Sequence, residues 1–224
     1  MLTEASVPRL LVDTKGRVAA KLRISVTDRC NFACLFCMPD KSAMRWLPSA
    51  DLLSFDEIER VTRVFVAMGI TKVRITGGEP LLRTGVEGLV KRLTGIHGLD
   101  SVDMTTNGWF LGSKAQTLKA AGLRGVTVSL HSLKEDRFTK ISGINALPRV
   151  LESISEAVRV GLHPIKINSV AIRGYNDDEV LDLVEYARKM NVAIRFIEFM
   201  PLDGLDIWDK EDGGWTRDPR HCQN

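Results

Sequence analysis

The stretch LRISVTDRCNFACLFCMP, from Leu22 to Pro39, joins a strand pattern to three closely spaced cysteines. The run LRISVT (22–27) is rich in residues that favour β-structure and predicts a strand. Cys30, Cys34 and Cys37 follow it in the spacing C-x3-C-x2-C. Because loops that follow strands often carry function, this segment is the first candidate for a site.

Three thiols at this spacing admit three interpretations. Positions 30, 34 and 37 share one face of a helix, although Asn31, Pro39 and Asp40 disfavour a helix there. Structural zinc needs four ligands, and no second C-x2-C or His pair lies nearby. A [4Fe–4S] cluster fits better, because three thiolates leave one iron open to a ligand that does not come from the protein.

The rest of the chain alternates strand and helix patterns. Strands are predicted at 22–27, 72–76, 101–105, 125–130, 165–172 and 192–199, and helices at 54–69, 85–95, 112–121, 147–160 and 177–189. Ser54 and Glu57 form a capping box at the start of the first helix, and Gly69 ends it. The Asn107-Gly108 pair predicts a turn.

This order of elements, without hairpins, predicts an α/β fold with a parallel sheet and right-handed crossovers. A doubly wound sheet and a partial (β/α)6 barrel both fit the order. In either fold, ligands bind at the carboxyl ends of the strands.

Composition limits the class of protein and its partners. The 224 residues are 44% hydrophobic and carry a net charge of +3, with scattered Lys and Arg. This predicts one domain, or two small ones at most, with no nucleic-acid or membrane surface. No apolar run of about 18 residues occurs, and residues 1–17 lack the pattern of a signal or transit peptide. The fourth cysteine, Cys222, is distant, which favours metal binding in a reducing, intracellular setting over disulfides.

A second polar cluster, RITGGEP (74–80), follows the second predicted strand. Gly77 and Gly78 lack side chains, so a ligand can approach the backbone at the strand end. Glu79 is a candidate to receive a cation, and Pro80 terminates the strand. A Gly-Gly pair alone is more often a tight turn, but next to the cysteine motif it indicates a site.

Together these two motifs resemble the radical S-adenosylmethionine (SAM) superfamily. The resemblance implies a partial (β/α)6 TIM-like barrel of the radical SAM type, with the cysteine loop after strand 1 and the GGE motif after strand 2. It also implies that Cys30, Cys34 and Cys37 bind a [4Fe–4S] cluster and that SAM chelates the open iron. Electron transfer from the cluster then yields a 5′-deoxyadenosyl radical.

Longer strings, among them KVRITGGEPLLR, MTTNG and IRFIEFMPLDG, are similar to the GTP 3′,8-cyclase (MoaA) family of molybdenum cofactor biosynthesis over about residues 10–204. The resemblance implies conversion of GTP to 3′,8-cyclo-7,8-dihydro-GTP. It also implies SAM contacts at Phe36, Gly78, Ser129 and Met200, and GTP contacts at Arg23, Arg74, Thr105 and Lys166. The three basic residues lie on or beside strands 1, 2 and 5, where they can face a triphosphate.

The sequence departs from this family in two ways. We expect its second three-cysteine motif and an Arg-x-Arg segment to be missing, since Cys222 is the only cysteine after the cluster. His131 stands where the family usually has Asp. The expected division is an N-terminal extension (1–21), the partial barrel (22–200) and an irregular tail (201–224), with the family's C-terminal cluster domain absent. GTP cyclisation by such a chain is expected to be impaired.

Three functions stay open: a GTP 3′,8-cyclase or its N-terminal catalytic part, a radical SAM enzyme that modifies a peptide, and a non-catalytic iron–sulfur or SAM-binding remnant. The basic residues and Thr105 favour a nucleotide substrate. The expected partners are GTP and an electron donor, and a homodimer is compatible with the sequence. The expected compartment is the cytoplasm for a bacterial protein and the mitochondrial matrix for a eukaryotic one.

Overall fold

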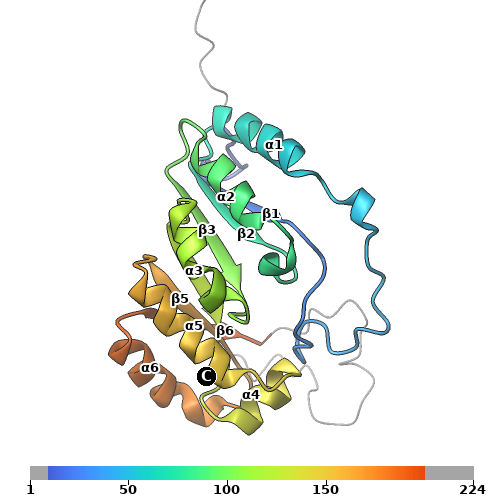
Figure 1. Cartoon of the computed structure of the whole chain (residues 1–224). Coiled ribbons are helices and arrows are strands. Elements are labelled where there is room, and N and C mark those ends of the chain that lie inside the picture. Colours follow the sequence, from blue (N-terminus) through green and yellow to red (C-terminus); the bar gives the residue numbers. More distant parts are fainter. Residues whose placement is uncertain (1–9, 200–224) are drawn as a thin grey trace, which may run out of the picture.

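A six-stranded parallel sheet with helices along it makes up the computed structural model, which describes residues 10–199 (Figure 1). In chain order the elements are β1 (Lys21–Ser25), η1 (Ser49–Asp51), α1 (Phe55–Ala67), β2 (Lys72–Thr76), η2 (Pro80–Leu82), α2 (Val86–Thr94), β3 (Ser101–Thr106), α3 (Leu111–Ala120), β4 (Gly125–Ser129), α4 (Glu135–Ser142), α5 (Leu147–Arg159), β5 (Ile165–Ala171), η3 (Asp177–Glu179), α6 (Val180–Lys189) and β6 (Ala193–Glu198).

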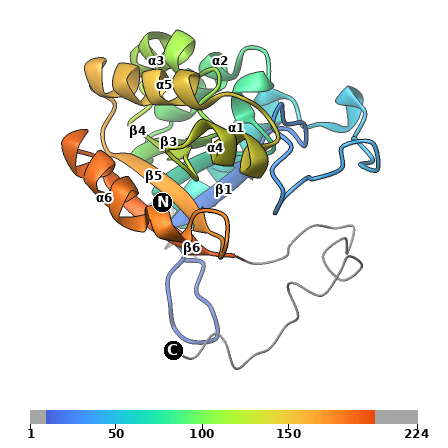
Figure 2. The ribbon, with the colours of Figure 1, turned by 90° about the horizontal axis from the view of Figure 1, so that it is seen from below.

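The strand order decides between the two predicted folds. The sheet runs β1-β2-β3-β4-β5-β6, and every neighbouring pair is parallel. Each crossover therefore moves one strand further in the same direction, whereas a doubly wound sheet reverses at a switch point. The partial (β/α)6 barrel is confirmed and the doubly wound alternative is wrong. Figure 2 shows the curved sheet with helices along its outer side.

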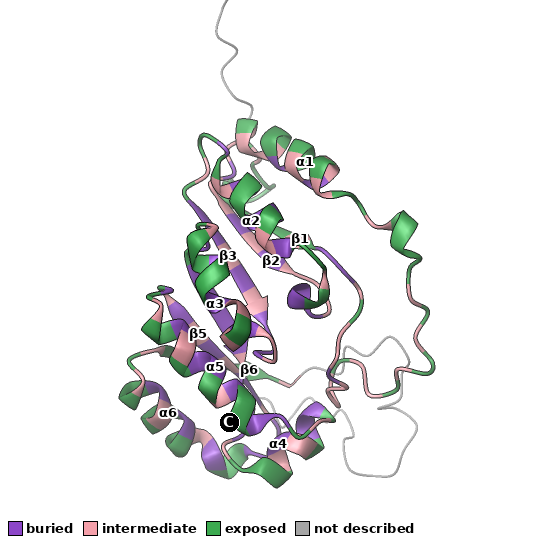
Figure 3. Ribbon diagram, viewed as in Figure 1, coloured by how far each residue is buried: buried purple, intermediate pink, exposed green. Residues whose placement is uncertain are grey.

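The two faces of the sheet differ in chemistry. The outer face packs against the helices and supplies the core, and seven of its side chains are at most 1% exposed: Val73, Ile75, Val102, Met104, Val126, Val128 and Ile167. Figure 3 shows the same division, with buried residues along the strands and exposed residues on the outer sides of the helices. Each fully buried side chain of this size contributes about 1.5–3 kcal/mol to folding.

The inner, concave face is polar. Because side chains alternate along a strand, the neighbours of the apolar residues point the other way. Register therefore aligns Arg23 with Arg74 and Asp103, and Asn168 with Arg195, on one face. Parallel sheets that are covered on both faces are usually apolar on both, so this charged face is suited to a ligand.

All six strands and all five helices predicted from the sequence are present. The capping box is confirmed: Ser54 N donates to Glu57 Oε2 at 2.7 Å, and Glu57 N donates to Ser54 Oγ at 3.2 Å. Gly69 follows α1 with a φ of +95°, the left-handed conformation expected at a helix end. Among the described residues, none of the helices has the length and apolar character needed to cross a bilayer.

The sequence analysis does not predict α4. This helix has eight residues, of which only Phe138, Ile141 and Ser142 are buried. Two turns are too short to establish an apolar period that stands out from a loop. The omission matters because α4 supports the cysteine loop.

Candidate functional site

The cysteine loop lies between β1 and η1 and docks on the carboxyl end of α4. The chain is irregular over 26–39 except for a turn at 35–37. The N–H groups of Ala33 and Leu35 donate to the carbonyls of Ser142 and Ile141, each at 3.0 Å. Carbonyls in the last turn of a helix have no partner within the helix, so the loop satisfies them. The helical interpretation of the cysteine spacing is wrong.

The three cysteines are free thiols in surroundings that disfavour the thiolate. Burial raises the pKa of Cys30 and Cys37, and it raises the pKa of Cys34 to about 12. The neighbouring cysteines add to the shift at Cys34, while the charge of Lys41 opposes it. Thiolates here need a positive centre close by, which a metal ion or cluster supplies, because ligating thiols are deprotonated.

Within residues 10–199, no three His, Cys, Asp or Glu side chains are arranged to hold a single metal ion. A tetrahedral zinc site places each sulfur about 2.3 Å from the metal, so its ligand atoms must converge. A [4Fe–4S] cluster takes its thiolates on separate irons, so its cysteines stand further apart. The three thiols of the loop are one short of the four ligands of a structural zinc site, and this count favours a cluster.

Glu79 ties the ends of β2 and β3 together. Its fully buried carboxylate accepts hydrogen bonds from Asn107 N at 2.7 Å, Thr106 Oγ1 at 2.8 Å and Leu81 N at 3.1 Å. Burial raises the pKa of Glu79 to about 7, against the effect of these donors. Hydroxyl and backbone donors engage this carboxylate.

The two glycines of the GGE motif let the backbone approach the cysteine loop. Gly78 N donates to Thr27 O at 2.7 Å, and Glu79 N donates to Arg29 O at 2.8 Å. A Cβ at Gly78 would overlap the carbonyl of Arg29, and one at Gly77 would overlap that of Thr27. The space that the glycines leave is therefore taken in part by the start of the cysteine loop.

His131 links the cysteine loop to β5. Its Nδ1 accepts a hydrogen bond from Val170 N at 3.1 Å, and its ring meets Phe36 edge to face, with centroids 5.0 Å apart. Burial lowers the pKa of His131 to about 4, so the imidazole is neutral at pH 7. With Nδ1 accepting, the proton is assigned to Nε2. An Asp side chain at this position would offer the same acceptor to Val170 N.

Arg74 stands at the centre of the concave face. Its Nη1 donates to Thr127 Oγ1 at 2.8 Å and to Thr105 Oγ1 at 3.4 Å. Its Nη2 pairs with Asp103 Oδ2 at 3.3 Å. These three contacts fix the direction of the guanidinium, so it is already oriented for an anion.

The concave face gathers more cations than the sequence analysis identified. Arg195 on β6 donates from Nε and Nη2 to Asn168 Oδ1 at 3.0 and 2.7 Å. Burial lowers the pKa of Lys166, and the charges of Arg195 and Arg74 lower it further. The pKa of Arg74 is likewise lowered by burial and then, against Asp103, by Arg195 and Arg23. Repulsion among cations is relieved when an anion binds between them.

The structure thus brings Arg23, Arg74, Thr105 and Lys166 together on one face. The sequence analysis did not predict Arg195 as a site residue, because a single Arg in a strand most often points to solvent. Only the register of β5 and β6, which places Arg195 opposite Asn168, shows that it lies on the concave face.

The predicted SAM residues lie at the carboxyl edge of the sheet as far as the structure describes them. Phe36 is in the cysteine loop, Gly78 follows β2, and Ser129 ends β4 in register with Asn168. Met200 lies outside the described residues.

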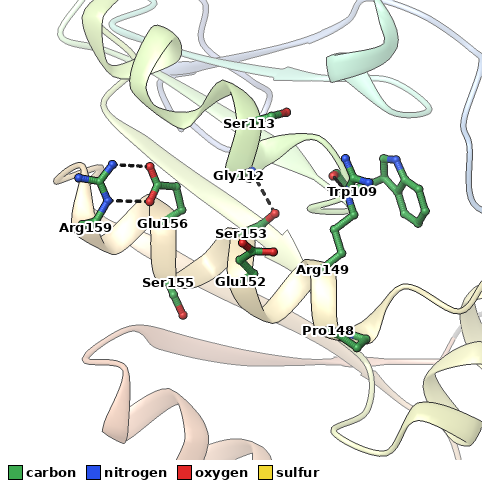
Figure 4. A pocket seen from close by; sticks show the side chains of 10 residues that line it. All are labelled: Trp109, Gly112, Ser113, Pro148, Arg149, Glu152, Ser153, Ser155, Glu156 and Arg159. Carbon is green, nitrogen blue, oxygen red and sulfur yellow. Dashed lines mark hydrogen bonds and ion pairs between the residues drawn. The ribbon is translucent and has the colours of Figure 1, made fainter.

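A hollow of about 780 Å³ lies on the outer layer, between α3 and α5 (Figure 4). Across it, Ser153 Oγ accepts a hydrogen bond from Gly112 N at 3.0 Å. The guanidinium carbon Cζ of Arg149 lies 4.5 Å from the centroid of the Trp109 ring. No cysteine and no residue of the concave face lines it. It is a groove between surface helices, separate from the candidate site.

Residues 24–187 match the family model of the Radical SAM superfamily. The chain belongs to this superfamily, whose cofactors are a [4Fe–4S] cluster and SAM. Its curated relatives include the GTP 3′,8-cyclase of Pelotomaculum thermopropionicum, 45% identical over 88% of this chain, and that of Thermodesulfovibrio yellowstonii, 46% identical over 89%. The chain covers 60% and 62% of these two proteins, respectively.

Solved structures share the fold at low sequence identity. Streptococcus suis SuiB bound to S-adenosylmethionine superposes with a TM-score of 0.72 and 18% identity, covering 88% of this chain and 44% of that one. The anSMEcpe structure with bound AdoMet gives a TM-score of 0.68 and 16% identity, covering 88% and 54%. At this identity the likeness shows the fold alone, and it agrees with the partial barrel.

The cysteine loop fits a [4Fe–4S] cluster. Its donor set is three thiols on one loop, each of which burial keeps from ionising without a positive centre. The amide Nδ2 of Asn31, next to Cys30 in the chain, is buried and has no partner among the described residues. A cluster sulfur is an acceptor that would satisfy it, and hydrogen bonds to sulfur are common around such clusters.

Substituting Gly78→Ala should displace the cysteine loop, because the new Cβ overlaps the carbonyl of Arg29. We expect the free energy of unfolding to fall by about 2 kcal/mol or more, and the iron and sulfide bound per chain to fall with it. Gly88→Ala in α2 is the matched control: its Cβ meets open space, so stability should rise by about 0.5–1 kcal/mol with full iron content. Full iron and unchanged stability in Gly78→Ala would contradict the close approach.

His131 should make stability depend on pH below neutrality. Its pKa is about 4 in the folded chain and about 6.5 when unfolded, so the unfolded chain binds the extra proton between these values. Through this group the free energy of unfolding therefore rises by about 3 kcal/mol at most between pH 4 and 6.5, and it is constant above pH 6.5. His131→Asn keeps an acceptor for Val170 N but does not titrate. Urea unfolding of the two cluster-free proteins measures this effect. From pH 4 to 6.5, the free energy of unfolding of the His131 protein should rise relative to that of His131→Asn. A difference between the two free energies that stays constant with pH would refute the prediction.

Proposed function

We propose that this chain is the radical-generating part of a GTP 3′,8-cyclase, a lyase of molybdenum cofactor biosynthesis that converts GTP to 3′,8-cyclo-7,8-dihydro-GTP. The observation that carries the proposal is the basic group on the concave face: Arg23, Arg74, Lys166 and Arg195. The relatives named GTP 3′,8-cyclase support it at 45–46% identity over most of this chain. The chain spans about 60% of the length of these relatives, so the activity of a whole cyclase is itself part of the proposal.

The basic group suits a triphosphate better than a peptide. The two guanidinium groups of Arg74 and Arg195 are held by hydroxyl and amide acceptors, Thr127 and Asn168, and keep further N–H donors for phosphate oxygens. A peptide backbone is neutral and would leave this clustered positive charge uncompensated. Burial lowers the pKa of Lys166 and repulsion from Arg195 and Arg74 lowers it further; a highly charged phosphate chain would remove that repulsion.

A bound cluster and SAM would supply a 5′-deoxyadenosyl radical, the species that the proposed reaction needs to take hydrogen from the ribose C3′ of GTP. The chain's own residues position the reactants. Cys30, Cys34 and Cys37 are proposed to hold the cluster, and Phe36, Gly78, Ser129 and Met200 to contact SAM. Arg23, Arg74, Thr105 and Lys166 are proposed to bind GTP, joined by Arg195, so that the ribose is fixed relative to the carboxyl edge of the sheet.

We also propose that residues 22–200 form the working unit and that an electron donor supplies the cluster with one electron per turnover. The proposed compartment is the bacterial cytoplasm or the mitochondrial matrix, where thiols stay reduced. A homodimer is compatible with this assignment.

Anaerobic turnover tests the proposal. The chain, loaded with iron and sulfide and reduced with dithionite, should form 5′-deoxyadenosine from SAM, and cyclised GTP when GTP is added. Deoxyadenosine without a GTP product would contradict cyclisation by this chain and leave a radical SAM enzyme of another substrate, such as a peptide. Formation of neither product by an iron-loaded chain would favour a non-catalytic remnant.

Arg195 should contribute to GTP binding. Arg195→Gln removes a cation and its charge-assisted hydrogen bonds, so we expect the Kd for GTP to rise about 10- to 100-fold. Arg188→Gln, on the exposed side of α6, changes net charge equally and should leave the Kd within about twofold. Equilibrium dialysis with labelled GTP measures both without turnover. Equal Kd values for the two variants would remove Arg195 from the site.

A further inference from the structure

Asn107, in the turn after β3, forms more hydrogen bonds than the turn itself requires. Its side-chain Oδ1 accepts a hydrogen bond from Trp109 N at 3.0 Å, which makes the turn that the sequence predicts. Its backbone N donates to Glu79 Oε2 at 2.7 Å. Only 8% of Asn107 is exposed. Because the side-chain Oδ1 and the backbone N–H of Asn107 both have fixed partners, the direction of its side-chain Nδ2 is fixed as well.

That nitrogen points at the cysteine loop. Nδ2 donates one hydrogen to Asn31 Oδ1 at 2.9 Å and the other to Cys30 Sγ at 3.7 Å, a length suited to a sulfur acceptor. The amide cannot be turned over, because Nδ2 would then face the N–H of Trp109, donor against donor. Both hydrogens of the amide are used.

A hydrogen bond to a ligand sulfur changes the energy of an iron–sulfur cluster. Reduction adds one electron, taken from a low-potential one-electron donor, and spreads its charge over irons and sulfurs. A donor aimed at Cys30 Sγ stabilises the reduced form more than the oxidised form, and so raises the reduction potential. The buried carboxylate of Glu79 acts in the opposite sense at the same cysteine, by Coulomb repulsion.

We propose that Asn107 is a positioning residue that raises the reduction potential of the cluster by donating a hydrogen bond to Cys30 Sγ. The inference rests on the cluster of a radical SAM protein and not on GTP. The test of this role needs no GTP. A result that excludes GTP as the substrate therefore leaves the role of Asn107 standing, and a result that excludes the role of Asn107 leaves GTP as the proposed substrate.

Asn107→Ser is the first test. The serine hydroxyl can still accept from Trp109 N, but it is too short to reach Cys30 Sγ. In an EPR-monitored redox titration of the SAM-free, iron-loaded protein, we expect the equilibrium constant for reduction to fall about tenfold, or about 59 mV for a one-electron couple. A midpoint equal to that of the unsubstituted protein would overturn the proposal.

Two further variants separate this role from a structural one. Thr106→Val removes the hydrogen bonds that Thr106 Oγ1 donates to Glu79 Oε1 and accepts from Gly108 N, and it leaves the donor to Cys30 Sγ in place. Stability should fall, but the midpoint should not: loss of a donor favours the neutral form of Glu79, which weakens its repulsion at Cys30 and moves the midpoint upward, opposite to Asn107→Ser. Asn107→Asp keeps the shape and the acceptor for Trp109 but replaces the donor with a charged oxygen, so its midpoint should fall further than that of Asn107→Ser. An equal shift in Thr106→Val would overturn the proposal. Failure of both Asn107 variants to bind iron would also overturn it, by assigning Asn107 to folding.

Discussion

The carboxylate of Glu79 takes three hydrogen bonds inside the carboxyl edge of the sheet, where water does not reach it. Burying a carboxyl group costs several kcal/mol unless donors compensate, and its raised pKa records that cost. The donors come from η2, from the last residue of β3 and from the turn after it, and the backbone N–H of Glu79 donates to Arg29 O in the cysteine loop. Three segments far apart in sequence are thereby fixed to one another, and the position of the cysteines depends on this junction.

The sheet places its hydrophobic core on the outer face and its charged side chains on the inner face. Barrels usually fill their interior with branched apolar side chains. Here the inner face carries Arg23, Arg74, Lys166 and Arg195, with the acid Asp103 beside Arg74. Burial, and then repulsion from Arg195 and Arg74, lowers the pKa of Lys166, so keeping these cations together on one face costs stability. The apolar contacts between the outer face and the helices offset that cost, so the residues that stabilise the fold and those proposed to bind GTP lie on opposite faces of the same strands.

The sequence was sufficient for the strands, the main helices and the cysteine motif, because alternation, capping and C-x3-C-x2-C spacing are local patterns. It was insufficient where a role depends on which residues meet across strands. Arg195 and Asp103 acquire their partners only through register, and Asn107 reads as a turn residue until Cys30 is placed beside it. The helix α4 was not predicted for a related reason. It is short, and its last carbonyls accept hydrogen bonds from the cysteine loop, a contact between distant segments that no local pattern predicts.

Register also sets the direction in which a nucleotide would lie. Arg23 and Arg74 are each two residues before the ends of their strands, which at 3.3 Å per residue is about 7 Å below the carboxyl edge. Lys21 and Lys72, in register with each other, lie two residues deeper on the same face, about 13 Å below it. In the proposed function, a triphosphate held by this ladder of cations would extend down the concave face. Its sugar would then be turned toward the edge, where the cysteine loop and Ser129 lie, so the order of cations along the strands would bring the ribose end of GTP to the proposed cluster.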